Sequence, residues 1–207
     1  MANVSQVKAK TFAANGADTT AICANQTNSG SGSMTLTNAN GVLVPGNLGT
    51  TVTIISTASD SNSGITFDVT GMGVDGSEVS QTGITGPAGT STVTTTTVFV
   101  SVTSITHSGT CTNVSCGITA TTTGTGVVFA GRTRVRGMHI KPSGTAGLID
   151  FKNTSSSGTK LLEIGVHTDQ TPVDPYIPDD GVLFNAGSFI NLGSTDLATN
   201  ITVFYDG

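Results

Sequence analysis

Residues 63–76 read SGITFDVTGMGVDG, a pattern that indicates the fold class. The apolar residues Ile65, Phe67 and Val69 alternate with polar ones, and this period of two places apolar side chains on one face of a β-strand. An Asp-Gly pair closes the stretch and supplies the positive φ that a hairpin turn requires. We therefore predict two antiparallel strands joined by a tight turn.

The same alternation recurs on both sides of this stretch, and a second turn pair, Asn40-Gly41, also lies between two alternating runs. No stretch of ten or more residues combines a period of 3.6 with capping signals, and the abundant Thr and Val favour strands. We therefore predict an all-β fold of antiparallel strands. The alternating sets include Val52/Ile54, Val98/Val100/Val102, Leu162/Ile164/Val166 and Ile201/Val203/Tyr205.

Composition divides the chain into three parts. Residues 1–33 are polar and end in a Gly/Ser-rich stretch typical of a flexible tether. All three Arg and three of the five Lys follow residue 130, behind a Thr-rich segment. We predict two antiparallel β-sandwich or jelly-roll-like domains preceded by an extended N-terminal arm. The arm covers residues 1–33, an Ig-like β-sandwich covers 34–126, and a small β-sandwich or jelly-roll-like domain covers 127–207.

Charge argues against one class of partner, and the length of the apolar runs argues against another. Only 10% of the residues are charged, the net charge is −5 and the pI is about 4.8, which is unlike a dedicated nucleic-acid binder. No apolar run approaches the roughly 18 residues of a membrane-spanning helix, so we expect no membrane partner. The first residues lack the basic and apolar regions of a secretory signal, and we expect synthesis in the cytoplasm.

A glycine motif at residues 71–76 matches the G-x-G-x-x-G pattern of dinucleotide-binding sites. Such a site needs a helix to begin at the last glycine, so that its N-terminus can hold the pyrophosphate. Residues 77–82 instead alternate like a strand. The motif therefore indicates a hairpin turn, and we predict no cofactor.

His107, Cys111 and Cys116 have H-x3-C-x4-C spacing, but zinc usually takes four ligands in two close pairs. The fourth would have to come from a distance, from Cys23, His139 or His167. Buried or surface thiols are the simpler interpretation, and a Cys111–Cys116 disulfide across a hairpin is an alternative in an oxidising medium.

Four carboxylates crowd the proline-rich region before residue 181, where hard oxygen ligands could hold calcium. The EF-hand spacing is absent, and Asp before Pro or Gly is ordinary turn chemistry. We therefore predict no metal site. The four residues are Asp169, Asp174, Asp179 and Asp180.

Catalytic patterns are absent from the sequence. Glutamate occurs only at Glu78 and Glu163, and no local pair of carboxylates suggests glycoside hydrolysis. No G-x-S-x-G motif exists, so we predict no catalytic residues and a protein that is not an enzyme. The absence of Trp and the presence of only two Tyr also argue against a sugar-stacking platform.

Arg132, Arg134 and Arg136 alternate, so a strand would place all three on one face, with Lys141 close behind. The planar guanidinium group suits carboxylates, and three together form a basic stripe on an acidic protein. These four residues are our candidate partner interface. A solvated strand face and a phosphate site are the alternatives.

Ten segments between residues 52 and 205 resemble segments of known proteins. The first part resembles a β-sandwich module of structural proteins of tailed bacteriophages, in the same order, through residues 52–56 (VTIIS), 63–71 (SGITFDVTG), 75–78 (DGSE), 85–90 (TGPAGT), 98–105 (VFVSVTSI) and 113–117 (NVSCG). The second part is similar to small virion proteins of marine phages through residues 131–137 (GRTRVRG), 147–152 (GLIDFK), 181–184 (GVLF) and 201–205 (ITVFY). From the resemblance we expect a valine or a similar residue where this chain has Cys116, which weakens a metal role for that residue.

The resemblance implies a non-enzymatic virion structural protein. We expect a capsid decoration or cement protein that binds the major capsid protein or other virion subunits and cross-bridges the assembled shell. The alternatives are a tail, adaptor or fibre-attachment subunit and a surface carbohydrate-binding module. We also expect a homo-oligomer, with a trimer favoured, and an N-terminal arm that becomes ordered on a neighbouring chain.

Overall fold

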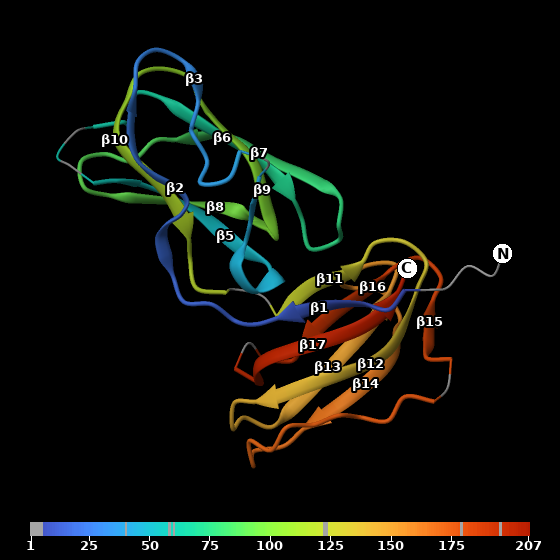
Figure 1. The fold of residues 1–207 in the computed structure, drawn as a ribbon. Coiled ribbons are helices and arrows are strands. Elements are labelled where there is room, and N and C mark those ends of the chain that lie inside the picture. The colour runs from blue at the N-terminus through green and yellow to red at the C-terminus, as the bar shows by residue number, and fades with distance from the viewer. Residues whose placement is uncertain are drawn as a thin grey trace.

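The computed structural model describes residues 6–39, 41–57, 59, 61–121, 124–178, 180–194 and 196–207, and within them the fold is all β (Figure 1). The described residues contain no α-helix, and so none long and apolar enough to cross a membrane. A 3-10 turn, η1, covers Pro45–Asn47. The strands are β1 (Lys8–Phe12), β2 (Asp18–Asn28), β3 (Gly32–Ser33), β4 (Val42–Leu43), β5 (Thr50–Ser56), β6 (Thr66–Met72), β7 (Glu78–Thr85), β8 (Thr92–Phe99), β9 (Ser101–His107), β10 (Cys111–Ile118), β11 (Thr125–Phe129), β12 (Thr133–Pro142), β13 (Gly147–Asn153), β14 (Lys160–Val166), β15 (Val182–Phe184), β16 (Ser188–Leu192) and β17 (Ala198–Asp206).

Four antiparallel sheets form two sandwiches, as the alternating sequence predicts. One sandwich, here called the inserted sandwich, pairs the sheet β2-β10-β5-β8 with the sheet β3-β9-β6-β7, where β4 also pairs with β9. The other, called the outer sandwich, pairs β1-β17-β12-β15 with β11-β16-β13-β14. The chain starts in the outer sandwich, leaves it after β1 to build the inserted sandwich, and returns at β11 (Figure 1).

Both sandwiches have the same nested strand pairing. In the outer sandwich the first strand pairs with the last, the second with the seventh, the third with the sixth and the fourth with the fifth: β1–β17, β11–β16, β12–β15 and β13–β14. The inserted sandwich repeats this order with β2–β10, β3 and β4 with β9, β5–β8 and β6–β7. This is the folded-over hairpin of a jelly roll. The prediction of an Ig-like first domain was therefore wrong, because an Ig sandwich groups its strands as ABED and CFG.

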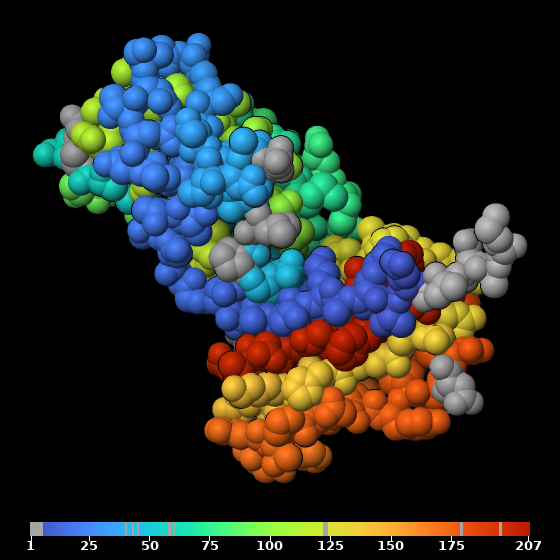
Figure 2. All heavy atoms as spheres, viewed as in Figure 1, coloured from blue at the N-terminus to red at the C-terminus, as the bar shows by residue number. Residues whose placement is uncertain are grey.

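The described part of the predicted arm, residues 6–33, corrects another expectation. It is extended, as predicted, but β1 pairs with β17 and β2 pairs with β10 of the same chain. The expectation that this segment becomes ordered on a neighbouring chain was thus wrong for both strands. Its polar character has a different cause: β1 and β2 are edge strands, and within β2 only Ile22 and Cys23 are fully buried. Figure 2 shows β1 lying along β17 on the face turned to the viewer.

Each sandwich has its own hydrophobic core. The inserted core consists mainly of aliphatic and thiol side chains around Phe67 and Phe99. The outer core contains Phe12, Phe151 and Phe184. The expectation of self-association rests on Phe184, Phe189 and Phe204, for which so small a domain offers little cover. Phe184 and Phe189 are buried within the chain, at 0% and 1% exposed, whereas Phe204 is 38% exposed. The oligomeric state stays a prediction, with support from Phe204 alone among the three.

The turn η1 connects the two cores. Leu48, which follows η1 and leads into β5, is 0% exposed and packs in the outer core instead of the inserted one. Two hydrogen bonds hold this loop in place: the Ala13 N–H donates to the Gly46 carbonyl at 2.9 Å, and the Asn47 side chain donates from Nδ2 to the Thr11 carbonyl at 2.8 Å. Gly46 has a φ of +77° and lies so close to Ala13 that a Cβ would be 2.0 Å from the Ala13 oxygen. Burying a leucine of this kind contributes roughly 1.5–3 kcal/mol.

Two further contacts fix the sandwiches to one another. The two connecting segments run side by side, where the Thr121 N–H donates to the Asn15 carbonyl at 2.9 Å and Thr121 Oγ1 accepts from the Asn15 N–H at 2.8 Å. The β6–β7 turn is the second contact: Asp75 Oδ1 accepts from both the N–H and the hydroxyl of Ser156, each at 3.0 Å. This turn is the predicted hairpin, with Gly76 at a φ of +71°.

Candidate partner-binding groove

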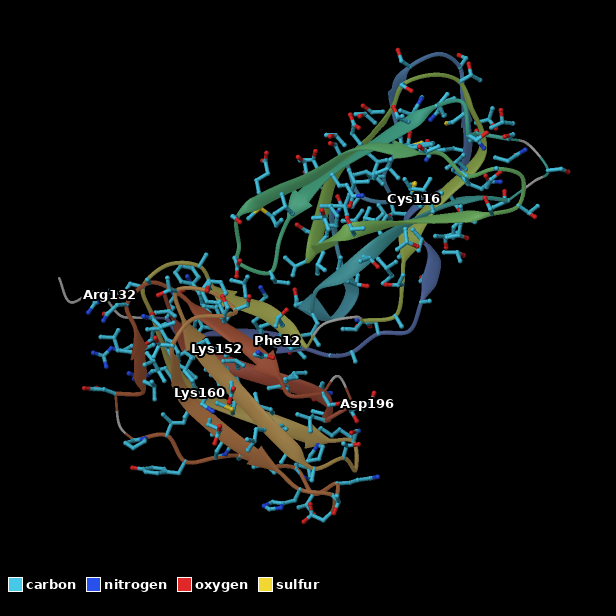
Figure 3. The ribbon with its side chains drawn as sticks, turned by 180° about the vertical axis from the view of Figure 1, so that it is seen from behind. Phe12, Cys116, Arg132, Lys152, Lys160 and Asp196 are labelled. Carbon is cyan, nitrogen blue, oxygen red and sulfur yellow. The ribbon has the colours of Figure 1, made fainter. Side chains whose placement is uncertain are left out.

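A groove of about 740 Å³ opens at one end of the outer sandwich. Its walls come from the start of β12, the end of β17, the start of β1 and the segment that leads into β15. Figure 3 shows Arg132 at this end and Asp196 at the opposite end of the same sandwich. The lining residues are Gln6, Lys8, Arg132, Thr133, Arg134, Arg136, Asp180, Leu183, Asp206 and Gly207.

A β-bulge determines which β12 side chains reach the groove. Arg134 pairs with Asp206 and Val135 with Tyr205, but the next pair joins Gly137 to Phe204, so Arg136 is the extra residue. Before the bulge Val135 faces the core, and after it Met138 and Ile140 do. The bulge therefore shifts the outward positions from even to odd numbers.

The shift separates Lys141 from the arginines. Lys141 is exposed on the outward face of β12, where it pairs with Asn200 of β17, but it lies beyond the groove. The structure thus brings together Arg132, Arg134 and Arg136 and leaves out the fourth predicted residue.

Two of the arginines are held by acceptors at the groove wall. Arg134 and Arg136 each donate from Nη1 to the Asp180 carbonyl, at 3.2 and 3.1 Å. Arg136 Nε also lies 3.4 Å from Asp206 Oδ2. A guanidinium group carries five N–H donors, so most donors of both residues remain available after these contacts.

Arg132 and Lys8 complete the cationic lining. Arg132 is exposed, and no described residue accepts a hydrogen bond from it or pairs with its charge. Lys8 donates from Nζ to the Gly207 oxygen and lies 5.4 Å from the centroid of the Phe129 ring. Four cations thus face two carboxylates, Asp180 and Asp206, so the described lining has an excess of positive charge. Guanidinium groups with free donors suit carboxylate oxygens on a partner.

The other candidate ligands are dispersed. Cys111 and Cys116 lie on one strand, β10, and both are buried, while His107 ends β9 and contacts the Gly109 carbonyl at 2.7 Å through Nδ1. Among the described residues, no group of three or more His, Cys, Asp or Glu could hold a metal ion.

The proline-rich region shows ordinary pairing. Asp174 Oδ1 lies 2.8 Å from Nδ1 of His139, and Asp169 Oδ1 accepts from the Thr171 N–H at 3.4 Å. Asp180 lines the groove. Asp179, like Asn40 of the other predicted turn, lies outside the described residues.

Sequence reasoning missed the contributions of Lys8, Asp180 and Asp206 to the groove. Lys8 and Asp206 come together because Lys8 pairs with Tyr205 across β1 and β17, a pairing that spans almost the whole chain. No local pattern reports such a contact. The only available signal was the alternation of Lys8 and Lys10, which marks a strand but not its partner.

Comparisons with known proteins found no matching family model, no matching curated protein and no matching solved structure. The resemblance to phage virion proteins therefore stays a prediction from the quoted residues.

Proposed function

We propose that this protein is a non-enzymatic structural protein of a phage virion, a capsid decoration protein that docks on the assembled shell through the groove of the outer sandwich. One observation carries the docking proposal. Arg132, Arg134, Arg136 and Lys8 converge on a single groove, although the chain as a whole has a net charge of −5. A groove of this charge fits an acidic segment of a shell subunit, whose carboxylates can accept from the free guanidinium donors.

The joint between the sandwiches supports a bridging role. Leu48, the paired connecting segments and the Asp75–Ser156 contact tie the two bodies together at separate points. A partner that binds one sandwich therefore positions the other without a hinge. Binding only the assembled arrangement of subunits stabilises that arrangement by mass action.

The test measures binding to shells of the phage that encodes the chain, purified without this protein. In the variant Arg132→Glu/Arg134→Glu, two groove cations become carboxylates, and like charges across an interface cost several kcal/mol. We expect at least a tenfold loss of co-sedimentation with the shells. Lys141→Glu is the matched control, because it reverses a charge on the outward face of the same strand but outside the groove, and it should bind within about twofold of the wild type.

Added salt gives a second readout. The Debye screening length falls to about 3 Å at 1 M ionic strength. Wild-type binding should therefore weaken as salt rises, and binding of the double variant should depend less on salt. If the double variant binds shells like the wild type, the groove is not the docking site. If the wild type fails to bind shells at all, the virion proposal is wrong.

A further inference from the structure

Two thiols face each other in the middle of the inserted sandwich. Cys23 of β2 and Cys116 of β10 are direct partners across an antiparallel pair, and both are 0% exposed within the same core. Figure 3 shows Cys116 deep within this sandwich. Directly opposed residues in such pairs have Cα atoms about 4.5–5.5 Å apart, which lies within the 4.4–6.8 Å span of protein disulfides.

The thiols themselves are in contact. A hydrogen bond with the Cys23 thiol, together with burial, raises the pKa of Cys116 well above its usual value. Contact between the side chains means that both Cβ atoms point to the same side of the sheet, as a disulfide requires.

Cys111 has a different partner across the strand pair. It lies five residues from Cys116 on β10, and the register of β10 with β2 shifts between them. Its own partner across the pair is Asn28, and its sulfur lies 3.9 Å from that of Met34. Cys23, and not Cys111, is therefore the cysteine that lies directly opposite Cys116.

We propose that Cys23 and Cys116 are an intramolecular disulfide site, which closes in an oxidising medium while Cys111 remains a thiol. The oxidant is a low-molecular-weight disulfide such as oxidised glutathione. One cysteine thiolate attacks it to give a mixed disulfide and one glutathione thiol, and the second cysteine then displaces the other glutathione. The two cysteine sulfurs lose two electrons, and their two protons end on the two glutathione thiols.

The pairing of β2 offers a route for the reagent. β2 is an edge strand, and its register with β10 shifts on both sides of the Cys23–Cys116 pair. Irregular pairing at an edge lowers the free energy of local opening, which exposes both thiols together.

The bond would join the first and last strands of the inserted sandwich. It would close a loop of about 90 residues, and long loops gain most from a cross-link because the unfolded chain loses more freedom. Both connections to the outer sandwich leave from these strands, so the disulfide would hold together the two strands through which the inserted sandwich joins the outer one. This inference does not depend on the virion proposal.

The experiment refolds the full chain from denaturant in mixed reduced and oxidised glutathione, so that access to buried thiols does not limit the result. Intact mass after alkylation in denaturant counts the remaining thiols. We expect one alkylated thiol in the wild type, none in Cys111→Ser and two in Cys23→Ser. Cleavage after Asp and Glu separates Cys23 from the other two cysteines, because Asp68, Asp75 and Glu78 lie between them.

Stability supplies the second readout. The oxidised wild type and Cys111→Ser should melt about 10 °C above their reduced forms, and Cys23→Ser should show no shift. Three free thiols in the refolded wild type, or a disulfide that contains Cys111, would overturn the proposal.

Discussion

The inserted and outer sandwiches have the same strand order but very different chemistry. Residues 13–124 contain four Asp, one Glu and neither Lys nor Arg, so all eight basic residues belong to the outer sandwich. The outer sandwich also contains six of the eight Phe and both Tyr, whereas all three Cys belong to the inserted one. The nested pairing thus does not depend on one type of core or one charge pattern. Alternation along each strand and antiparallel pairing of the first strand with the last are sufficient for this strand order.

The two sandwiches differ equally in how the chain builds them. The inserted sandwich is continuous in sequence, while the outer one takes β1 from one side of the insertion and the remaining strands from the other. It also takes Leu48 from the loop that leads into β5. The outer core is therefore complete only when the inserted sandwich is present.

Cutting the chain at these boundaries should change the stability of the two sandwiches most. A fragment of residues 13–124 keeps every strand of the inserted sandwich and should show a cooperative thermal transition. A fragment of residues 125–207 lacks β1, Phe12 and Leu48, and should remain unfolded, because the loss of even one fully buried Phe from a core costs about 3–5 kcal/mol. Circular dichroism of the two fragments checks this. A folded 125–207 fragment would mean that the outer sandwich does not need its first strand.

A substitution of Leu48 should destabilise the protein less than these cuts, but it should show clearly to which core the residue belongs. Leu48→Ala should destabilise the outer sandwich by about 2–5 kcal/mol, although the residue precedes a strand of the inserted one. Val52→Ala, four residues later and also 0% exposed, removes a side chain from the inserted core. Hydrogen exchange should show faster opening of β12 and β17 in the first variant and of β5 and β10 in the second. The same exchange pattern in both variants would contradict the assignment of Leu48 to the outer core.

Substitutions of the two glutamates of the chain, one in each sandwich, should change the stability least, and they should differ in their pH dependence. A hydrogen bond from Lys160 lowers the pKa of Glu163, and Glu163 in turn raises the pKa of Lys160. A lowered carboxyl pKa contributes stability above the unfolded value near 4.5, and this contribution is lost as the pH falls through the folded value.

Glu163→Gln should therefore be slightly less stable than the wild type at pH 7, and the two proteins should be equally stable at a pH below the folded pKa of Glu163. Glu78→Gln is the control in the inserted sandwich, because Glu78 has no ion pair with any described residue. Urea unfolding across the pH range checks both. A pH-independent difference for Glu163→Gln would remove the ion pair as its cause.

Local sequence features predicted the strands better than their partners. The Asp75-Gly76 turn and the alternation at Ile65, Phe67 and Val69 depend on neighbours within a few residues, and both appear as predicted. The nested strand order could not be predicted in this way, because a strand such as β1 carries no mark of a partner almost 200 residues away. The polar composition of residues 1–33 instead resembled that of a tether.

The groove was predictable only in part for a related reason. Strict alternation correctly groups Arg132, Arg134 and Arg136, but it gives no sign of the bulge at Arg136. Without the bulge, Lys141 would face the core, since it is an odd number of residues from each arginine. The lining residues from β1 and β17 depend on the long-range pairing and could not be found from the sequence.

The position of β1 beside β17 also determines how the molecule would respond to mechanical tension. Lys8 lies opposite Tyr205, so a pull applied at these two ends separates the strands one residue pair at a time instead of shearing them all at once. Once Phe12 leaves the outer core, the tension passes to β2 and β10, which are again the first and last strands of a sandwich. The nested fold would therefore give way in a fixed sequence, outer sandwich before inserted one, and a bond between Cys23 and Cys116 would stop the second stage.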